Sequence, residues 1–271
     1  MKLSMNFKRI ITGLIGFPIV ACIIIFENKY VIDFLFSIIS AMSLYEYNKA
    51  LKLEKNPVTW IGYVACGLIS FMHLIPLQYL PYAIGIIIPV MVLLMFLHII
   101  FSKMKTNIVD IAKTFFGIFY IVVFLAFIPL LMGGENGKRL IFYILFAGWG
   151  TDTFAYFTGR WFGKHKLCEI SPKKTIEGSI GGVIGAVILV LIHTAVLNNF
   201  YGMNINYLIV LGIGIILSLL GQIGDLAAST IKRYAEIKDY GNLLPGHGGM
   251  LDRIDSIIFI APFAYFLLML I

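Results

Sequence analysis

The chain has 271 residues, of which 60% are hydrophobic and 13% are charged, and its mean hydropathy is +0.93. This composition leaves no room for a separate soluble domain of ordinary size, and it predicts a single membrane-embedded domain, residues 1–271, of the all-α polytopic class. The formal net charge of +7 indicates attraction to anionic membrane lipid, whereas nucleic acid is a poor alternative partner because no soluble binding fold is indicated.

Apolar stretches near the ~20 residues needed to cross a bilayer predict nine spans. In chain order these spans are 10–26, 31–47, 58–76, 81–101, 111–132, 140–158, 178–197, 207–230 and 256–271. The first span follows Lys2, Lys8 and Arg9, as the apolar segment of a signal peptide would. Because no small-residue cleavage site precedes Glu27, we interpret it as a retained helix.

The basic residues are distributed unevenly between the two sides that these spans define. With the N-terminus inside, every Lys and Arg except Lys29, Lys138 and Arg139 falls on or beside an inside segment. Cytoplasmic segments carry the excess of basic residues in membrane proteins. We therefore expect a multi-pass protein of the bacterial cell (inner) membrane, with the N-terminus and the active-site loops cytoplasmic and the C-terminus outside.

Polar residues are rare in the first five spans and frequent after residue 148. Asp33, Glu46, His73 and His98 lie in or near the first five spans. We interpret them as interfacial or packing residues, so residues 1–135 are predicted to form a scaffold with candidate dimer contacts. Residues 136–271 are predicted to hold the catalytic helices and the cytoplasmic loops.

The first polar cluster is GWGTDTFAYFTGR, residues 148–160, which places Asp152 inside a predicted helix. A carboxylate within the membrane is costly unless it is paired or binds a metal. The alternative is an aspartate that forms hydrogen bonds within its own helix.

The second cluster is the loop KHKLCEISPKKTIEGSIGG, residues 164–182. Lys173, Lys174, Thr175 and Glu177 stand where the next helix begins, and small residues follow them. A helix N-terminus with lysines nearby suits a phosphate, although a loop that only sets topology also carries lysines. The acidic Glu177 among the lysines favours a site.

The third cluster runs from the end of one span into the next. Asp225, Ser229 and Lys232 are separated by four and then three residues, so they lie on one face of a helix. The Gly-rich turn that follows has backbone amides that could approach an anion. Asp252 and Asp255 are three residues apart, so they can point the same way once the last helix has begun.

These carboxylates predict a site for a divalent cation and phosphate. Asp225, Asp252 and, as a third, Asp255 offer oxygen ligands, which Mg²⁺ prefers, while lysines and arginines neutralise phosphate charge. No Ser-His-Asp arrangement and no Walker-type GxxxxGK[ST] string is evident. The pattern therefore favours direct phosphoryl or nucleotidyl transfer, which needs positioning and charge stabilisation and no protein nucleophile.

The pattern from Ser229 to Asp255, S-x-I-K-R-x4-K-D-x-G-x2-L-P-x-H-G-G-M-x-D-R-I-D, resembles the signature of the phosphatidate cytidylyltransferase family, also called CDP-diacylglycerol synthase. The upstream strings DTFAYFTGRWFGKHKL and ISPKKTIEG are also similar to that family, although a tryptophan is often expected at Ile176. The motifs cover residues 148–255, and the first five spans add only compatible length and hydropathy.

The resemblance implies a transferase of phospholipid biosynthesis that converts CTP and phosphatidate into CDP-diacylglycerol and pyrophosphate. It implies Mg²⁺, with a second metal or a monovalent cation as a further candidate cofactor, and a homodimer. The catalytic residues that it implies are Asp225, Lys232, Asp252 and Asp255. The implied metal ligands are Asp225, Asp252 and Asp255, with Asp152 as a further candidate.

The resemblance also implies residues that bind the substrates. They are Lys173, Lys174, Thr175, Glu177, Ser229, Arg233, Lys238, His247, Gly248, Gly249 and Arg253. The basic residues of the motif would contact phosphates, and Lys173, Lys174 and the Gly-rich turns would shape the nucleotide site. His247 is expected to donate a hydrogen bond in the turn rather than to act as a general base.

Two other functions are compatible with the residues. One is a CTP-dependent polyprenol or phytol kinase of the same layout, which product analysis would separate from a cytidylyltransferase. The other is an ion or metabolite transporter whose acidic residues line a pathway. Transport is disfavoured because the charges cluster at one face and no repeat symmetry is visible.

Overall fold

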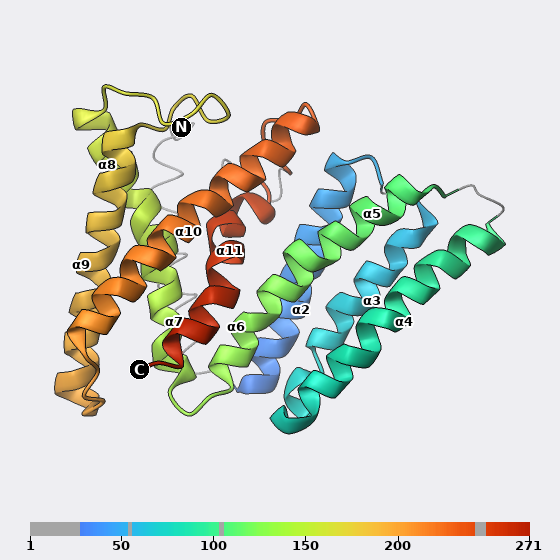
Figure 1. Cartoon of the computed structure of the whole chain (residues 1–271), viewed down its shortest axis with the longest axis horizontal. Helices are drawn as coiled ribbons and strands as arrows, with labels where there is room; N and C mark the ends of the chain where they lie inside the picture. Colours follow the sequence, from blue (N-terminus) through green and yellow to red (C-terminus); the bar gives the residue numbers. More distant parts are fainter. Residues whose placement is uncertain (1–27, 54–55, 103–105, 242–247) are drawn as a thin grey trace, which may run out of the picture. The chain divides into compact units, whose positions relative to one another are not determined.

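The computed structural model describes residues 28–53, 56–102, 106–241 and 248–271 (Figure 1). Within these ranges the chain is predominantly helical and forms no strand, and Lys166 and Thr175 make an isolated antiparallel bridge. The predicted all-α class is confirmed.

Five helical stretches of the described residues are long and apolar enough to cross a membrane. They are Leu77–Phe101, Ile108–Met132, Gly137–Phe162, Ile176–Tyr201 and Tyr207–Tyr234. Each coincides with one of the predicted spans, so the chain is a polytopic membrane protein, as the hydropathy pattern predicted.

Two further predicted spans, 31–47 and 256–271, fall on helices α2 (Lys29–Ala50) and α11 (Leu251–Leu268). Neither helix is among the five stretches that are long and apolar enough to cross a membrane.

The predicted span 58–76 is interrupted, because helix α3 (Trp60–Ile69) ends seven residues before it does. The span at 10–26 lies outside the described residues. The count of nine spans therefore stays a prediction.

The chain divides into two compact units. The first combines Met1–Gly133 with Asp239–Asp252, and the second combines Gly134–Lys238 with Arg253–Ile271. The division near Gly133 lies close to the predicted boundary between residues 135 and 136. The motif that ends at Asp255 is itself shared between the units, since its central segment belongs to the first unit.

Five helices make up the described part of the first unit. They are α2, α3, α4 (Leu80–Phe101), α5 (Ile108–Gly117) and α6 (Phe124–Met132). Asn107 begins α5 with a capping box, in which its side chain accepts the N–H of Asp110 and the Asp110 carboxylate accepts the N–H of Asn107. A π-helical segment, Ile118–Val123, continues α5 directly into α6.

Helix α4 differs from its neighbours because most of its residues are exposed or half-buried among the described residues. The helix is predominantly apolar, and Met95 is its one buried residue. Lipid or another helix covers such a surface in a membrane. The homodimer through the N-terminal helices stays a prediction.

Four helical stretches make up the second unit. They are α7 (Gly137–Leu145) continued by α8 (Thr151–Phe162), α9 (Ile176–Tyr201), α10 (Tyr207–Tyr234) and the part of α11 from Arg253 onwards. A π-helical segment, Phe146–Gly150, joins α7 to α8 without a break. This segment ends two residues before Asp152, which lies in the first turn of α8.

Helices α8 and α9 run side by side along a seam of glycines (Figure 1). Gly181 lies against Thr158 and Gly185 against Phe154, which makes the two helices antiparallel. A Cβ added at Gly182 would lie 2.9 Å from the carbonyl oxygen of Thr151. Small residues at spacings of four allow such close approach between membrane helices.

Buried hydroxyl groups add hydrogen bonds between the helices of this unit. Thr151 on α8 and Ser218 on α10 are 2.7 Å apart through their hydroxyl oxygens. Ser179 on α9 donates its hydroxyl to Gln222 on α10, and the Gln222 amide donates back to the Ser179 carbonyl at 3.3 Å. These bonds set where the first turns of α8 and α9 lie relative to α10.

Candidate active site

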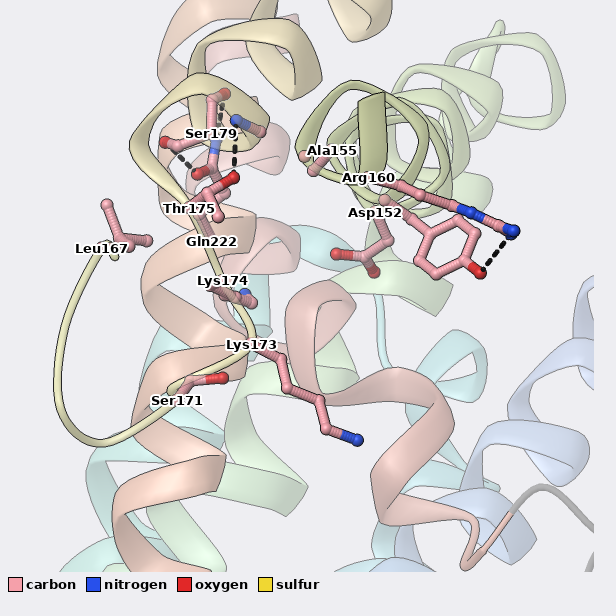
Figure 2. Close-up of a pocket in the computed structure, with 13 residues that line it drawn as sticks. Asp152, Ala155, Arg160, Leu167, Ser171, Lys173, Lys174, Thr175, Ser179 and Gln222 are labelled. Carbon is pink, nitrogen blue, oxygen red and sulfur yellow. Dashed lines mark hydrogen bonds between the residues drawn. The ribbon is translucent and has the colours of Figure 1, made fainter. Parts of the chain in front are cut away.

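The second unit contains a cavity of about 510 Å³ (Figure 2). Helix α8, the loop before α9, the start of α9 and one residue of α10 enclose it. The lining residues that carry polar side chains are Asp152, Tyr156, Arg160, Ser171, Lys173, Lys174, Thr175, Ser179 and Gln222. This cavity brings the first and second predicted clusters together.

Three carboxylates of this unit come from three different helices. Asp152 on α8 and Asp255 on α11 each lie within electrostatic range of Asp225 on α10, and also of one another. Ser256 donates its hydroxyl to Asp152 at 3.4 Å and its N–H to Asp255 at 2.9 Å. The structure thus gathers three of the four predicted metal ligands, including the further candidate Asp152.

A glycine allows the helices that carry two of these carboxylates to approach closely. Gly224 precedes Asp225, and a Cβ at Gly224 would lie 2.7 Å from the carbonyl oxygen of Asp255. Any larger residue would push α11 away from α10 at the level of the two aspartates.

Basic side chains surround the carboxylates. Lys174 forms an ion pair with Asp225. Arg253 lies within electrostatic range of Asp152, and Lys232 lies within range of Asp255. Such pairs offset the cost of placing carboxylates at a membrane protein's interior, and they present cations to an incoming phosphate.

The loop before α9 is held by its own side chains and carries the two lysines. Glu177 accepts the N–H groups of Lys164 at 3.1 Å and His165 at 3.3 Å, and its other oxygen lies 2.6 Å from the His165 ring nitrogen. Thr175 caps α9 by accepting the N–H of Gly178 at 3.1 Å. Glu177 therefore contacts the loop backbone and does not line the cavity. Thr175 caps the helix and also lines the cavity.

Other predicted residues lie elsewhere on the same unit. Arg233 donates to the carbonyl oxygen of Ile170 at 3.4 Å. Arg233 and Lys238 line a separate, more open hollow of about 390 Å³. Ser229 is half-buried on α10 between the two places.

The central part of the motif belongs to the first unit, where carboxylates hold its backbone. Asp252 Oδ2 accepts the N–H of Tyr240 at 2.8 Å and of Gly249 at 3.0 Å. Gly248 has a φ of +82°, which suits glycine, and a Cβ there would lie 2.9 Å from Asp252 Oδ2. The predicted role of His247 falls outside the described residues.

Sequence reasoning did not assign a site role to several residues that the structure places at these positions. Tyr156, Arg160, Ser179 and Gln222 line the cavity. Glu46 accepts backbone N–H groups of the motif. The available signal was a polar residue inside an apolar span, which Gln222 and Glu46 both show.

The donor chemistry suits a hard divalent cation that arrives with phosphate. Within the described ranges, no three acidic, histidine or cysteine side chains are arranged to hold a metal by themselves. Mg²⁺ usually keeps several waters and takes one or two carboxylates plus substrate phosphates. Asp152, Asp225 and Asp255 supply carboxylate oxygens of that kind beside the lysines.

The model of the cytidylyltransferase family matches residues 7–271. The phosphatidate cytidylyltransferase of Bacillus subtilis (strain 168) is 37% identical over 274 residues, which cover 97% of this chain and 97% of the relative. The phosphatidate cytidylyltransferases of Staphylococcus haemolyticus (strain JCSC1435) and Staphylococcus aureus (strain COL) are 40% and 41% identical over 172 residues, 63% of this chain and 64% of each relative.

Proposed function

The chain belongs to the cytidylyltransferase family, and we propose that it catalyses the reaction of CTP with phosphatidate, which yields CDP-diacylglycerol and pyrophosphate. The observation that carries this proposal beyond the family is the cavity in which Asp152 and Lys174 face the same space, with Asp225 and Asp255 in electrostatic range (Figure 2). It supplies both signs of charge that a nucleotidyl transfer requires, and it lies among helices long enough to meet a lipid substrate.

The reaction needs no protein nucleophile, because phosphatidate is itself an anionic nucleophile. An oxygen of its phosphate forms a bond to the α-phosphorus of CTP. The bond from that phosphorus to the β-phosphate oxygen breaks, and pyrophosphate leaves with the electron pair. Catalysis then rests on holding the two phosphates in line and on stabilising the charge that develops on the transferred group.

Lys174 is placed to bind the phosphates of CTP during this transfer. In the structure its ammonium group pairs with Asp225, and a triphosphate in the cavity would offer it a competing anion. Lys173 extends from the neighbouring position into the same cavity (Figure 2). Both lysines would bind phosphate oxygens and stabilise the leaving pyrophosphate.

The carboxylates are proposed to bind Mg²⁺. Asp225 and Asp255, with Asp152 beside them, would contribute oxygen ligands together with the phosphates of CTP. The bound metal would supply charge neutralisation at the phosphates. The role of Asp252 as a further ligand, and that of a second metal or monovalent cation, remain parts of the same proposal.

The proposed arrangement of the reaction places CTP on the cytoplasmic side and phosphatidate in the inner leaflet of the cell membrane. The distribution of basic residues supports it, because Lys173, Lys174, Lys232 and Arg253 belong to segments that the positive-inside rule assigns to the cytoplasm. Anionic lipid and nucleotide would then meet at the same charged face.

The test is product formation by detergent-purified protein with CTP, phosphatidate and Mg²⁺. We expect a nucleotide-linked lipid and one pyrophosphate per lipid, both abolished by a metal chelator and restored by excess Mg²⁺. Phosphorylation of a polyprenol or of phytol with release of CDP would instead establish the kinase. A folded protein that makes neither product, but moves an ion or metabolite across vesicles, would establish the transporter.

A further inference from the structure

Glu46 is a buried carboxylate for which the proposed reaction has no use. It belongs to α2, and 6% of it is exposed. Its Oε1 accepts the N–H of Met250 at 2.9 Å, and its Oε2 accepts the N–H of Leu251 at 2.8 Å. Because Leu251 is the first residue of α11, Glu46 binds the backbone at the start of that helix.

A carboxylate at this place has a defined physical effect. The first N–H groups of a helix have no acceptor within the helix, and a negative charge near them is favoured by the helix dipole. Two oxygens that accept two consecutive N–H groups also restrict how the first turn can rotate. Asp252 stands in that first turn, and Asp255 follows one turn later on the same helix.

Glycines of the motif make room for this carboxylate. A Cβ at Gly241 would lie 2.6 Å from Glu46 Oε1, and a Cβ at Gly249 would collide with both Glu46 oxygens. The Glu46 carboxylate therefore explains why glycine occupies both positions: any side chain there would collide with it.

We propose that Glu46 is a positioning residue of the cytidylyl transfer, which fixes the start of α11 and with it the orientation of Asp252. Glu46 does not touch CTP or phosphatidate. The inference rests on the proposed function, and it adds to that function a residue from the N-terminal half that acts through the backbone of the motif.

Glu46→Gln replaces one accepting oxygen by an NH₂ group that faces a backbone N–H. We expect kcat to fall on the order of 10- to 100-fold, since small displacements of catalytic groups cost about that much, while KM for CTP changes less than about twofold because the CTP cavity is lined by other residues. Glu46→Asp, which keeps the charge, should recover part of kcat. Gly241→Ala, which crowds the carboxylate, should reproduce the loss.

The matched control is Asp33→Asn, because Asp33 is a second buried carboxylate of α2 that also accepts a backbone N–H, that of His73 at 3.0 Å. It should lower the unfolding temperature and leave kcat and KM unchanged. Hydrogen exchange at the amides of Met250 and Leu251 gives a readout without substrate. We expect exchange there to rise at least about tenfold in Glu46→Gln through local opening, and to stay unchanged in Asp33→Asn.

The proposal is overturned if exchange at these two amides is unchanged in Glu46→Gln. It is also overturned if exchange rises but kcat does not fall, or if Asp33→Asn lowers kcat as much as Glu46→Gln does. If the wild-type protein makes no CDP-diacylglycerol, the proposed function is wrong, and amide exchange alone then decides whether Glu46 holds the start of α11.

Discussion

The two units use carboxylates in different ways. In the first unit, Glu46 and Asp252 accept hydrogen bonds from backbone N–H groups of the motif. In the second unit, Asp225 pairs with the ammonium group of Lys174, and Asp152 and Asp255 lie within its electrostatic range. A backbone donor cannot leave its acceptor without unfolding, whereas a lysine can exchange a carboxylate for a phosphate. Glu46 and Asp252 of the first unit therefore fix the chain, whereas the cluster around Asp225 in the second unit keeps charge available for a ligand.

The largest effect is expected at the centre of the second unit. Asp225→Asn should lower the rate of CDP-diacylglycerol formation on the order of 10³-fold, because it removes the charge that pairs with Lys174 and that is proposed to bind metal. Initial rates at saturating CTP measure the effect, and an unchanged unfolding temperature shows that the fold is intact. A rate within tenfold of wild type would remove Asp225 from the catalytic set.

The next substitution tests whether Asp252 only holds the backbone, as Glu46 does, or also binds metal. Asparagine keeps an oxygen that can accept the N–H groups of Tyr240 and Gly249 but loses the negative charge. We expect Asp252→Asn to lower the rate on the order of 10²-fold if that charge helps to hold Mg²⁺. A wild-type rate would show that Asp252, like Glu46, only holds the backbone, and its assignment as a metal ligand would then be wrong.

A smaller effect is expected when a cation is removed. Lys174→Gln should raise KM for CTP about tenfold, which is about 1.4 kcal/mol, because it deletes a charge-assisted contact to phosphate. Lys173→Gln is the matched control: it removes the same charge from the adjacent, more exposed lysine, and we expect about a threefold rise. Equal effects of the two substitutions would show that the pairing of Lys174 with Asp225 has no bearing on binding.

The smallest effect is expected at Glu177, the carboxylate of the second unit that holds backbone as those of the first unit do. Glu177→Gln keeps one oxygen for the N–H groups of Lys164 and His165, so we expect only about a two- to threefold rise in KM for CTP, because the loop loses part of its order. Steady-state kinetics at several CTP concentrations measure it. A loss of 100-fold or more would mean that Glu177 contacts substrate, as the sequence predicted.

Hydropathy was sufficient to predict the class of the fold and the positions of five spans. It failed where apolar composition and helix geometry disagree: the predicted span at 58–76 is interrupted after Ile69. It also could not anticipate that the central segment of the motif belongs to the first unit. Residues such as Met250 and Leu251 contact Glu46 through backbone N–H groups, and the type of a residue carries little information about where its backbone bonds.

The candidate site was predictable where charged side chains stand in unusual surroundings. Asp152, Asp225 and Lys174 were identified because charge is rare in this chain, and the structure brings these three close together. Gln222 was missed because an uncharged amide within an apolar span carries a weaker signal. Glu177 was predicted to bind substrate because it is charged, but its carboxylate accepts backbone N–H groups of the loop. Residue type and spacing alone do not reveal such donors.

The π-helical segment Phe146–Gly150 constrains how many residues the chain can have between α7 and α8. A π turn accommodates one residue more than an α turn, so it changes the phase of α8 relative to α7 by about 100°. Deleting a single residue there would restore an unbroken α-helix and turn Asp152 away from the cavity, although every side chain of α8 would remain the same. The number of residues in this segment is therefore as constrained as the residue types at the site. We expect a one-residue deletion within the segment to be tolerated less than most substitutions there.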